Sequence, residues 1–129
     1  MESILTSVKK LLGITAECTN FDSDIIMHIN SVFLILNQIG VGPSKGYRIT
    51  DEFNTWDEFI SEDNPRLEAV KSYMYMKVKL LFDPPSSSAV MDSTNRLLNE
   101  LEWRIQTEVD DSTKGEEDDQ NESNTLPTW

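Results

Sequence analysis

Few side chains in this sequence have the types and spacing that catalysis or metal binding requires. The chain holds one histidine, His28, and one cysteine, Cys18. A nucleophile–base pair would need His28 to meet Cys18 or a serine in space. A single thiol also forms no internal disulfide and no multi-thiolate metal site. We therefore interpret His28 as a structural side chain of a helix.

Three further patterns resemble ligand sites only superficially. Asp22 and Asp24 have the spacing that opens a calcium loop, but the glycine and the distal glutamate of that loop are missing, so we assign them to helix capping. The glycines and lysine of residues 40–46 lack the Walker spacing and follow no strand, which indicates a turn. The acidic pairs at 57–58 and 62–63 are interpreted as solvated charges. We predict no catalytic residue, no cofactor and no metal site, and hence no enzyme.

The overall charge narrows the classes of partner. The chain has 129 residues, with 23 acidic and 11 basic groups, and a formal net charge of -12. This length fits one domain, and no apolar run is long enough for a membrane span. The start of the chain lacks the continuous apolar segment of a signal peptide, so we expect a soluble, cytosolic product. A protein this acidic has too few cations to neutralise the phosphates of a nucleic acid and bind its backbone. It can lie beside DNA without binding it, or imitate DNA toward a basic partner.

More than half of the net charge is concentrated at the C-terminal end. Residues 108–129 contain eight acidic side chains and one lysine, a net charge of -7. Such a segment has too few large apolar groups to offset its ordering entropy, which predicts an extended acidic tail after a domain of residues 1–107. Its last residues include two apolar side chains, Leu126 and Trp129, so we interpret the tail as a segment that binds another protein surface.

Apolar residues at helical spacing predict four main helices. The first covers about 4–12 and ends at Gly13, with Lys9 and Lys10 on its solvated face. The second begins at Asp22 and runs to about residue 39, with apolar residues on several faces, as expected for a helix buried on more than one side. The third follows the Asn64–Pro65 start signal and ends at about residue 82, before Pro84 and Pro85. The last helix is capped by Ser86 or Ser87.

The final helix carries an apolar stripe and one tryptophan off that stripe. The stripe comprises Val90, Thr94, Leu97, Leu98, Leu101 and Ile105. Trp103 lies two residues from Leu101, about 200° round the helix axis, and should therefore point away from the stripe. Tryptophan is enriched at interfaces, which favours a subunit contact; a lone surface tryptophan is the alternative.

Between the second and third main helices, residues 40–64 lose the helical period. A short strand is expected around residues 47–49, and Thr55–Glu58 has the pattern of a capping box that opens one helical turn. Loops this long are usually functional or bind a partner, and this one carries four large aromatic residues. They are Tyr47, Phe53, Trp56 and Phe59. The alternative is a loop folded back as a lid on the core. The prediction is an all-α bundle of about four helices with an irregular or hairpin-like insertion at 40–64.

In their order along the chain and in several short sequence segments, these elements resemble the small head–tail connector proteins of long-tailed double-stranded DNA phages. The resemblance covers about residues 3–107. Its most specific pieces are the KLLGI of residues 10–14, the segment AVKSYMYMKVKLLFDPP of residues 69–85 and the ExxWR pattern of Glu100–Arg104. None of these pieces is a catalytic motif, and the acidic tail lies outside the resemblance.

The resemblance implies a helical adaptor of the virion neck. Members of this family form a ring, typically dodecameric, that binds the portal on one side and a stopper or tail-completion protein on the other. The genome passes through the central channel without specific binding, and assembly takes place in the host cytoplasm, with no membrane partner. The expected contact residues are Tyr47, Phe53, Trp56, Phe59, Trp103, Leu126 and Trp129. The alternative hypothesis is an acidic phage regulator or DNA mimic that binds a basic host protein. A mimic would spread carboxylates over a folded face, so the concentration of charge in the tail favours the adaptor.

Overall fold

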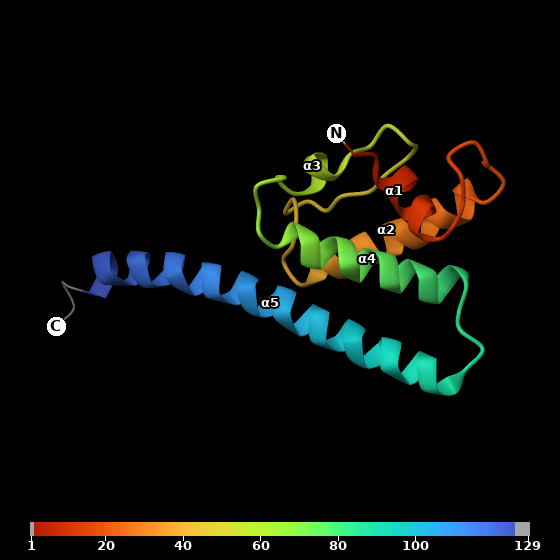
Figure 1. The fold of residues 1–129 in the computed structure, drawn as a ribbon. Helices are drawn as coiled ribbons and strands as arrows, with labels where there is room; N and C mark the ends of the chain where they lie inside the picture. Colours follow the sequence, from red (N-terminus) through yellow and green to blue (C-terminus); the bar gives the residue numbers. More distant parts are fainter. Residues whose placement is uncertain (1, 126–129) are drawn as a thin grey trace.

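The residues that the structure describes form five helices (Figure 1). The computed structural model describes the backbone of residues 2–125 and the side chains of residues 2–107. The helices are α1 (Ile4–Leu11), α2 (Asp22–Gln38), the single turn α3 (Trp56–Phe59), α4 (Leu67–Phe82) and α5 (Ser88–Thr125). The described residues contain no strand, so the prediction of an all-α fold is confirmed, while the strand expected around residues 47–49 is wrong. That segment is tied to a side chain of α2 instead of a second strand.

Helix α4 is the centre of the fold, because α1, α2 and α5 all pack against it. Its buried face repeats at helical spacing and comprises Leu67, Val70, Tyr73, Met74 and Val78, and α2 contributes the opposite wall of the core. At the junction with α5, the Tyr73 hydroxyl donates a hydrogen bond of 3.1 Å to Glu102. The most completely buried large side chains are Trp56, Tyr73, Phe33, Ile4, Ile25, Ile29, Leu36, Ile49, Met74 and Ile105.

The connection from α1 to α2 is held by a buried lysine. We expected Lys9 on a solvated face, and this is wrong: only 3% of the residue is exposed. Its ammonium donates to the carbonyls of Cys18 at 2.7 Å and Ala16 at 3.2 Å, and it lies 2.8 Å from the carboxylate of Asp22. These partners compensate the desolvation of the charge, which is why a lysine is tolerated there. The ion pair anchors the start of α2 to α1.

Two helix starts differ slightly from the expected positions. Helix α4 begins at Leu67, because Asn64 and Pro65 belong to a preceding turn in which the Asn64 side chain accepts from the Arg66 amide at 2.9 Å. Helix α5 begins at Ser88, just after the predicted cap. Of its apolar stripe, Leu98 and Ile105 are buried, whereas Val90 and Leu97 remain about half exposed.

Helix α5 is much longer than predicted. We expected it to end near Thr107 and to be followed by an extended tail, but the helix continues to Thr125 and projects from the rest of the molecule (Figure 1). The sequence contains no proline between Pro85 and Pro127, and glutamate, glutamine and lysine are good helix formers. Composition alone therefore did not determine the backbone conformation of this acidic segment. None of the helices that the structure describes is long and apolar enough to cross a bilayer.

Candidate interaction surface

The aromatic residues of the 40–64 segment divide into a buried group and an exposed one. Phe33 of α2 is the centre of the buried group, with ring centroids 4.6 Å from Phe59, 5.1 Å from Tyr47 and 6.3 Å from Trp56. Trp56 is only 2% exposed and Phe59 only 4%. Trp56 and Phe59 therefore fit the alternative prediction, a loop folded back as a lid on the core. The prediction that these two side chains contact another protein is wrong in the described structure. Their burial pins the segment onto α2.

Trp56 also joins the loop to the first helix. Its indole N–H donates to the Ser7 hydroxyl at 3.0 Å, so the one polar atom of a buried tryptophan is satisfied. The backbone amide of Trp56 donates to the Glu2 carbonyl at 3.2 Å, and Ile4 donates to the Asn54 carbonyl at 3.0 Å. The N-terminal residues and the loop therefore form one rigid unit on top of the core.

A glycine permits the close packing of the loop over Phe59. Gly42 has a φ of +87°, in the left-handed region that favours glycine. A Cβ atom at this position would clash with the Phe59 ring. The backbone at residue 42 can thus lie directly on the aromatic ring only because no side chain intervenes.

The tip of the loop is fixed by one carboxylate. Glu58 Oε1 accepts from the Tyr47 hydroxyl at 2.8 Å, from the Asn54 side-chain amide at 3.1 Å and from the Thr55 backbone amide at 3.2 Å. The last of these is the bond expected of a capping box. Hydrogen bonds from Asn54, Tyr47 and Thr55 lower the pKa of Glu58, while burial and the Glu58 carboxylate raise the pKa of Tyr47. Tyr47 is half-buried and serves this network.

Phe53 lies at the tip of this network and points outward. Its side chain is 76% exposed, yet its backbone amide donates to the Asp51 carboxylate at 2.8 Å, and the neighbouring Asn54 side chain accepts from the Thr50 amide at 2.9 Å. An exposed phenylalanine on a hydrogen-bonded loop is presented in a defined position. Such preorganisation reduces the entropy lost when a partner binds.

Trp103, on α5, is the second of the predicted contact residues that is largely exposed. It is 66% exposed, as its position opposite the stripe predicted. Glu102 accepts a hydrogen bond from Tyr73 of α4, and Leu98 and Ile105 are buried, so the rotation of α5 is fixed with the indole facing outward. Leu126 and Trp129, the remaining predicted contact residues, lie outside the described residues.

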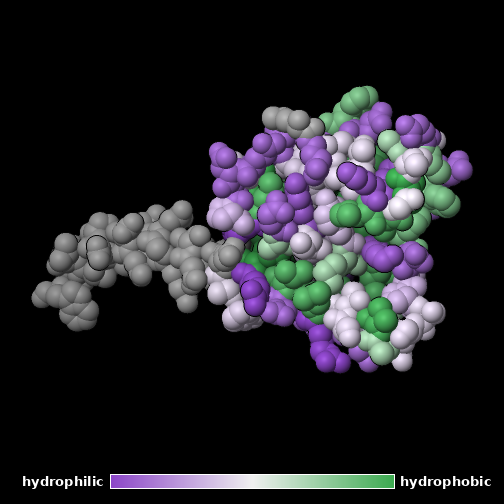
Figure 2. All heavy atoms as spheres, in the orientation of Figure 1, coloured by the Kyte–Doolittle hydropathy of each residue, from purple (hydrophilic) through white to green (hydrophobic). Residues whose placement is uncertain are grey.

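Sequence reasoning missed a group of exposed aliphatic residues. Val90 and Leu97 on α5, Met27 and Leu34 on α2, and Leu11 on α1 are all about half exposed. Figure 2 shows hydrophobic residues gathered on the visible face along α5. The extra apolar positions on α2 were visible in the sequence as residues outside its main stripe. The described residues contain no cluster of histidine, cysteine and carboxylates suited to a metal ion.

These features define a class: a small helical domain that carries isolated exposed aromatic and aliphatic side chains on a well-packed frame. The comparisons with known proteins then give the family. Residues 4–112 match the family model described as phage connector protein, and the chain belongs to this family. The resemblance stated from the sequence, to phage head–tail connectors, is thereby confirmed. No curated protein and no solved structure matches the chain.

Proposed function

We propose that this chain is the subunit of a ring, dodecameric in the resembled proteins, that joins the portal to a stopper or tail-completion protein in the virion neck. Its role is structural, with no catalysis and no cofactor. The ring assembles in the host cytoplasm and surrounds the channel through which the genome passes. Membership of the phage connector family supports the head–tail connector role.

The observation that carries the proposal is the presentation of Phe53 and Trp103. At 76% and 66% exposed, these are the two most exposed aromatic side chains among the residues whose burial the structure describes; the next, Phe21, is 45% exposed and packs edge-on against Phe82. Aromatic side chains supply much of the binding energy at protein interfaces, because they bury a large area with little loss of rotamer freedom. We assign Phe53 and Trp103 to contacts with the portal or with the tail-side protein.

The uncovered flank of α5 supports packing between subunits. Val90 and Leu97 lie on the same side of the helix, 20° apart by helical geometry. Val90 lines a groove with Leu80 and Met76 of α4, next to the α4–α5 turn. Apolar side chains left exposed along a helix are covered when an identical subunit packs beside it, and we assign this flank to the contact between neighbouring copies.

The net charge is compatible with a DNA channel. A subunit with a charge of -12 repeated around an axis gives a strongly negative surface, from which the phosphate backbone is repelled. A ring of this kind lets DNA slide because it offers few cations to neutralise phosphates.

The mass of the protein in solution tests the proposal. Light scattering after size exclusion is measured for the chain alone and after mixing with the purified portal complex. We expect the chain to co-elute with the portal in many copies per portal ring. A chain that stays a monomer and elutes apart from the portal would contradict the proposal and favour the alternative, an acidic protein that binds a basic host partner.

A further inference from the structure

An open groove lies between α2 and the segment 45–48. It has a volume of about 830 Å³ and extends along α2 from Ser23 to Asn37. Asn30 holds the two walls together, because its side-chain amide donates to the Ile49 carbonyl at 3.0 Å and its oxygen accepts from the Ile49 amide at 2.8 Å. The groove is thus a fixed feature of the fold, built by a pair of hydrogen bonds that mimics a strand pairing.

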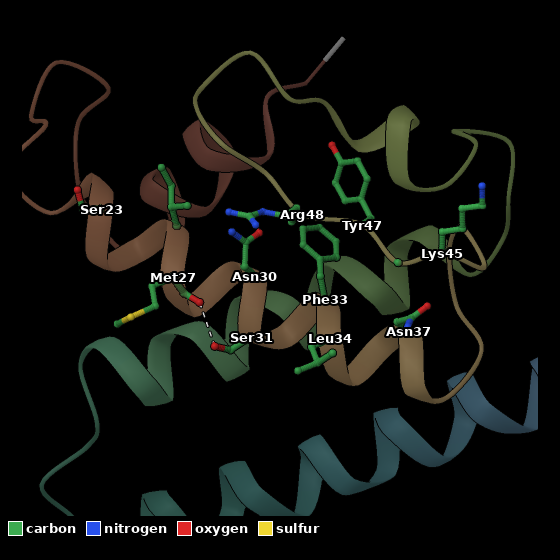
Figure 3. Close-up of a pocket in the computed structure, with 12 residues that line it drawn as sticks. Ser23, Met27, Asn30, Ser31, Phe33, Leu34, Asn37, Lys45, Tyr47 and Arg48 are labelled. Carbon is green, nitrogen blue, oxygen red and sulfur yellow. Dashed lines mark hydrogen bonds between the residues drawn. The ribbon is translucent and has the colours of Figure 1, made fainter.

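The charge of this groove is opposite to that of the protein. Acidic residues outnumber basic ones by two to one in the chain, yet none of the groove-lining residues is acidic. Lys45 and Arg48 line it, and both are exposed and form no ion pair with any described residue. Figure 3 shows the two cations on the loop side and the side-chain amides of Asn30 and Asn37 on α2. The groove therefore offers positive charge and amide donors to an anionic ligand.

Apolar side chains lie beside these polar groups. Met27 and Leu34 are more than half exposed on the outer face of α2, and Phe33 lines the groove between them and Tyr47. A ligand that fits this surface combines carboxylates with a few large apolar residues. A free anion or a nucleic acid backbone would use the cations and leave the apolar side chains uncovered.

The chain itself contains a segment of this composition. Residues 108–129 carry a net charge of -7 and end in a sequence with Leu126 and Trp129. The backbone of α5 continues to Thr125 and leads this segment away from the helical domain (Figure 1). At 1.5 Å per residue, residues 108–125 extend about 27 Å, and the groove from Ser23 to Asn37 extends about 21 Å along α2. The segment is long enough to cover the groove of another copy.

We propose that the groove between α2 and residues 45–48 of one copy binds the acidic C-terminal segment, residues 108–129, of a second copy. The contact links neighbouring subunits through charge complementarity and adds the apolar end of the segment to Met27 and Leu34. This inference rests on the proposed function in one respect only, which is that a second copy of the chain must lie beside the first.

A labelled synthetic peptide of residues 108–129 tests this contact directly. Fluorescence anisotropy is recorded while the full-length protein is added, at low ionic strength, without portal. We expect saturable binding that weakens as salt is added, because the contact depends on charge. The K45E/R48E variant should bind the peptide at least tenfold more weakly, and a peptide with L126A and W129A should also bind the wild-type protein more weakly.

The matched control is K10E/R96E, which reverses one lysine and one arginine that are likewise exposed and outside the groove. It should bind the peptide as the wild type does. Equal loss in both double variants would show a non-specific charge effect and overturn the proposal, as would the absence of any binding to the wild-type protein. Peptide binding without portal co-elution would refute the proposed function and leave this contact standing. Portal co-elution without peptide binding would refute this contact and leave the proposed function standing.

Discussion

Phe53 and Trp56 are three residues apart in one loop but lie in opposite environments. Phe53 is 76% exposed and Trp56 is 2% exposed. Trp56 contacts Phe33 and bonds to Ser7, so it fixes the loop on the helices. Phe53 makes no such contact, and its backbone is held by Asp51. The buried aromatic side chains around Phe33, which we call the frame, hold the loop in place. Phe53 on the loop and Trp103 on α5 are exposed, and we call these two the contact set.

The largest effect should come from removing the centre of the frame. The W56A substitution leaves a cavity beside Phe33 and removes the indole donor from the Ser7 hydroxyl, which keeps its own bond to the Ile4 carbonyl. It should lower the free energy of unfolding by about 3 to 5 kcal/mol. Urea denaturation followed by circular dichroism measures this loss. W56F keeps a ring but loses the hydrogen bond, and should cost less. If W56A cost under about 1 kcal/mol, the loop would not be part of the core.

A pair of glycines isolates the close packing of the loop. Gly42 and Gly13 both have positive φ, but a Cβ at Gly42 would clash with Phe59, whereas one at Gly13 would meet nothing within 4 Å. We expect G42A to lower the free energy of unfolding by about 2 to 4 kcal/mol and G13A by about 1 kcal/mol. Thermal and urea unfolding of the two variants give the comparison. Equal costs would mean that only backbone strain matters at residue 42.

The contact set should show the reverse pattern. F53A and W103A remove exposed side chains, so each should change the free energy of unfolding by less than about 0.5 kcal/mol. Each should weaken binding to the portal complex or to the tail-side protein at least tenfold, which corresponds to about 1.4 kcal/mol. Surface plasmon resonance with immobilised partner measures the affinity.

The controls for these two variants are E52A at the same loop tip and Q106A on α5, since both residues are exposed. They should bind as the wild type does. Unchanged affinity of F53A and W103A for both partners would remove these residues from the interface.

The smallest effect concerns the pH dependence of the loop tip. The pKa of Glu58 is lowered from its ordinary value of 4.5 by its hydrogen bonds. A lowered pKa in the folded state means that the carboxylate stabilises the loop above pH 4.5 and loses this effect as the pH falls through the lower value. The amide resonance of Thr55 should therefore shift in NMR spectra below pH 4.5. In E58Q this shift should be absent; if it persisted, another group would control the loop.

Local patterns in the sequence were enough to predict most of the helices and the exposure of Trp103. The Gly13 stop, the start of α2 at Asp22 and the prolines after α4 act within one turn, so their effects can be predicted without the fold. The exposure of Trp103 also follows from helix geometry and the position of the apolar stripe.

The remaining features depend on contacts between distant residues. Trp56 is buried because Ser7, 49 positions earlier, accepts its N–H, and Lys9 is buried because the chain folds back to give it three oxygen partners. The groove beside α2 exists because Asn30 pairs with Ile49. The helical backbone beyond Thr107 was not predicted. The acidic, apolar-poor composition indicated an extended tail, whereas the absence of proline before Pro127 leaves the helix free to continue. No short-range pattern specifies which loop aromatic turns inward.

Electron microscopy of the chain assembled with its portal tests the central claim most directly. The account predicts a ring of copies coaxial with the portal, with an open channel along the axis and with the loop of Phe53 or the Trp103 face of α5 against the portal or the tail-side protein. Copies bound singly, off the axis, or with both aromatic residues facing solvent would contradict it.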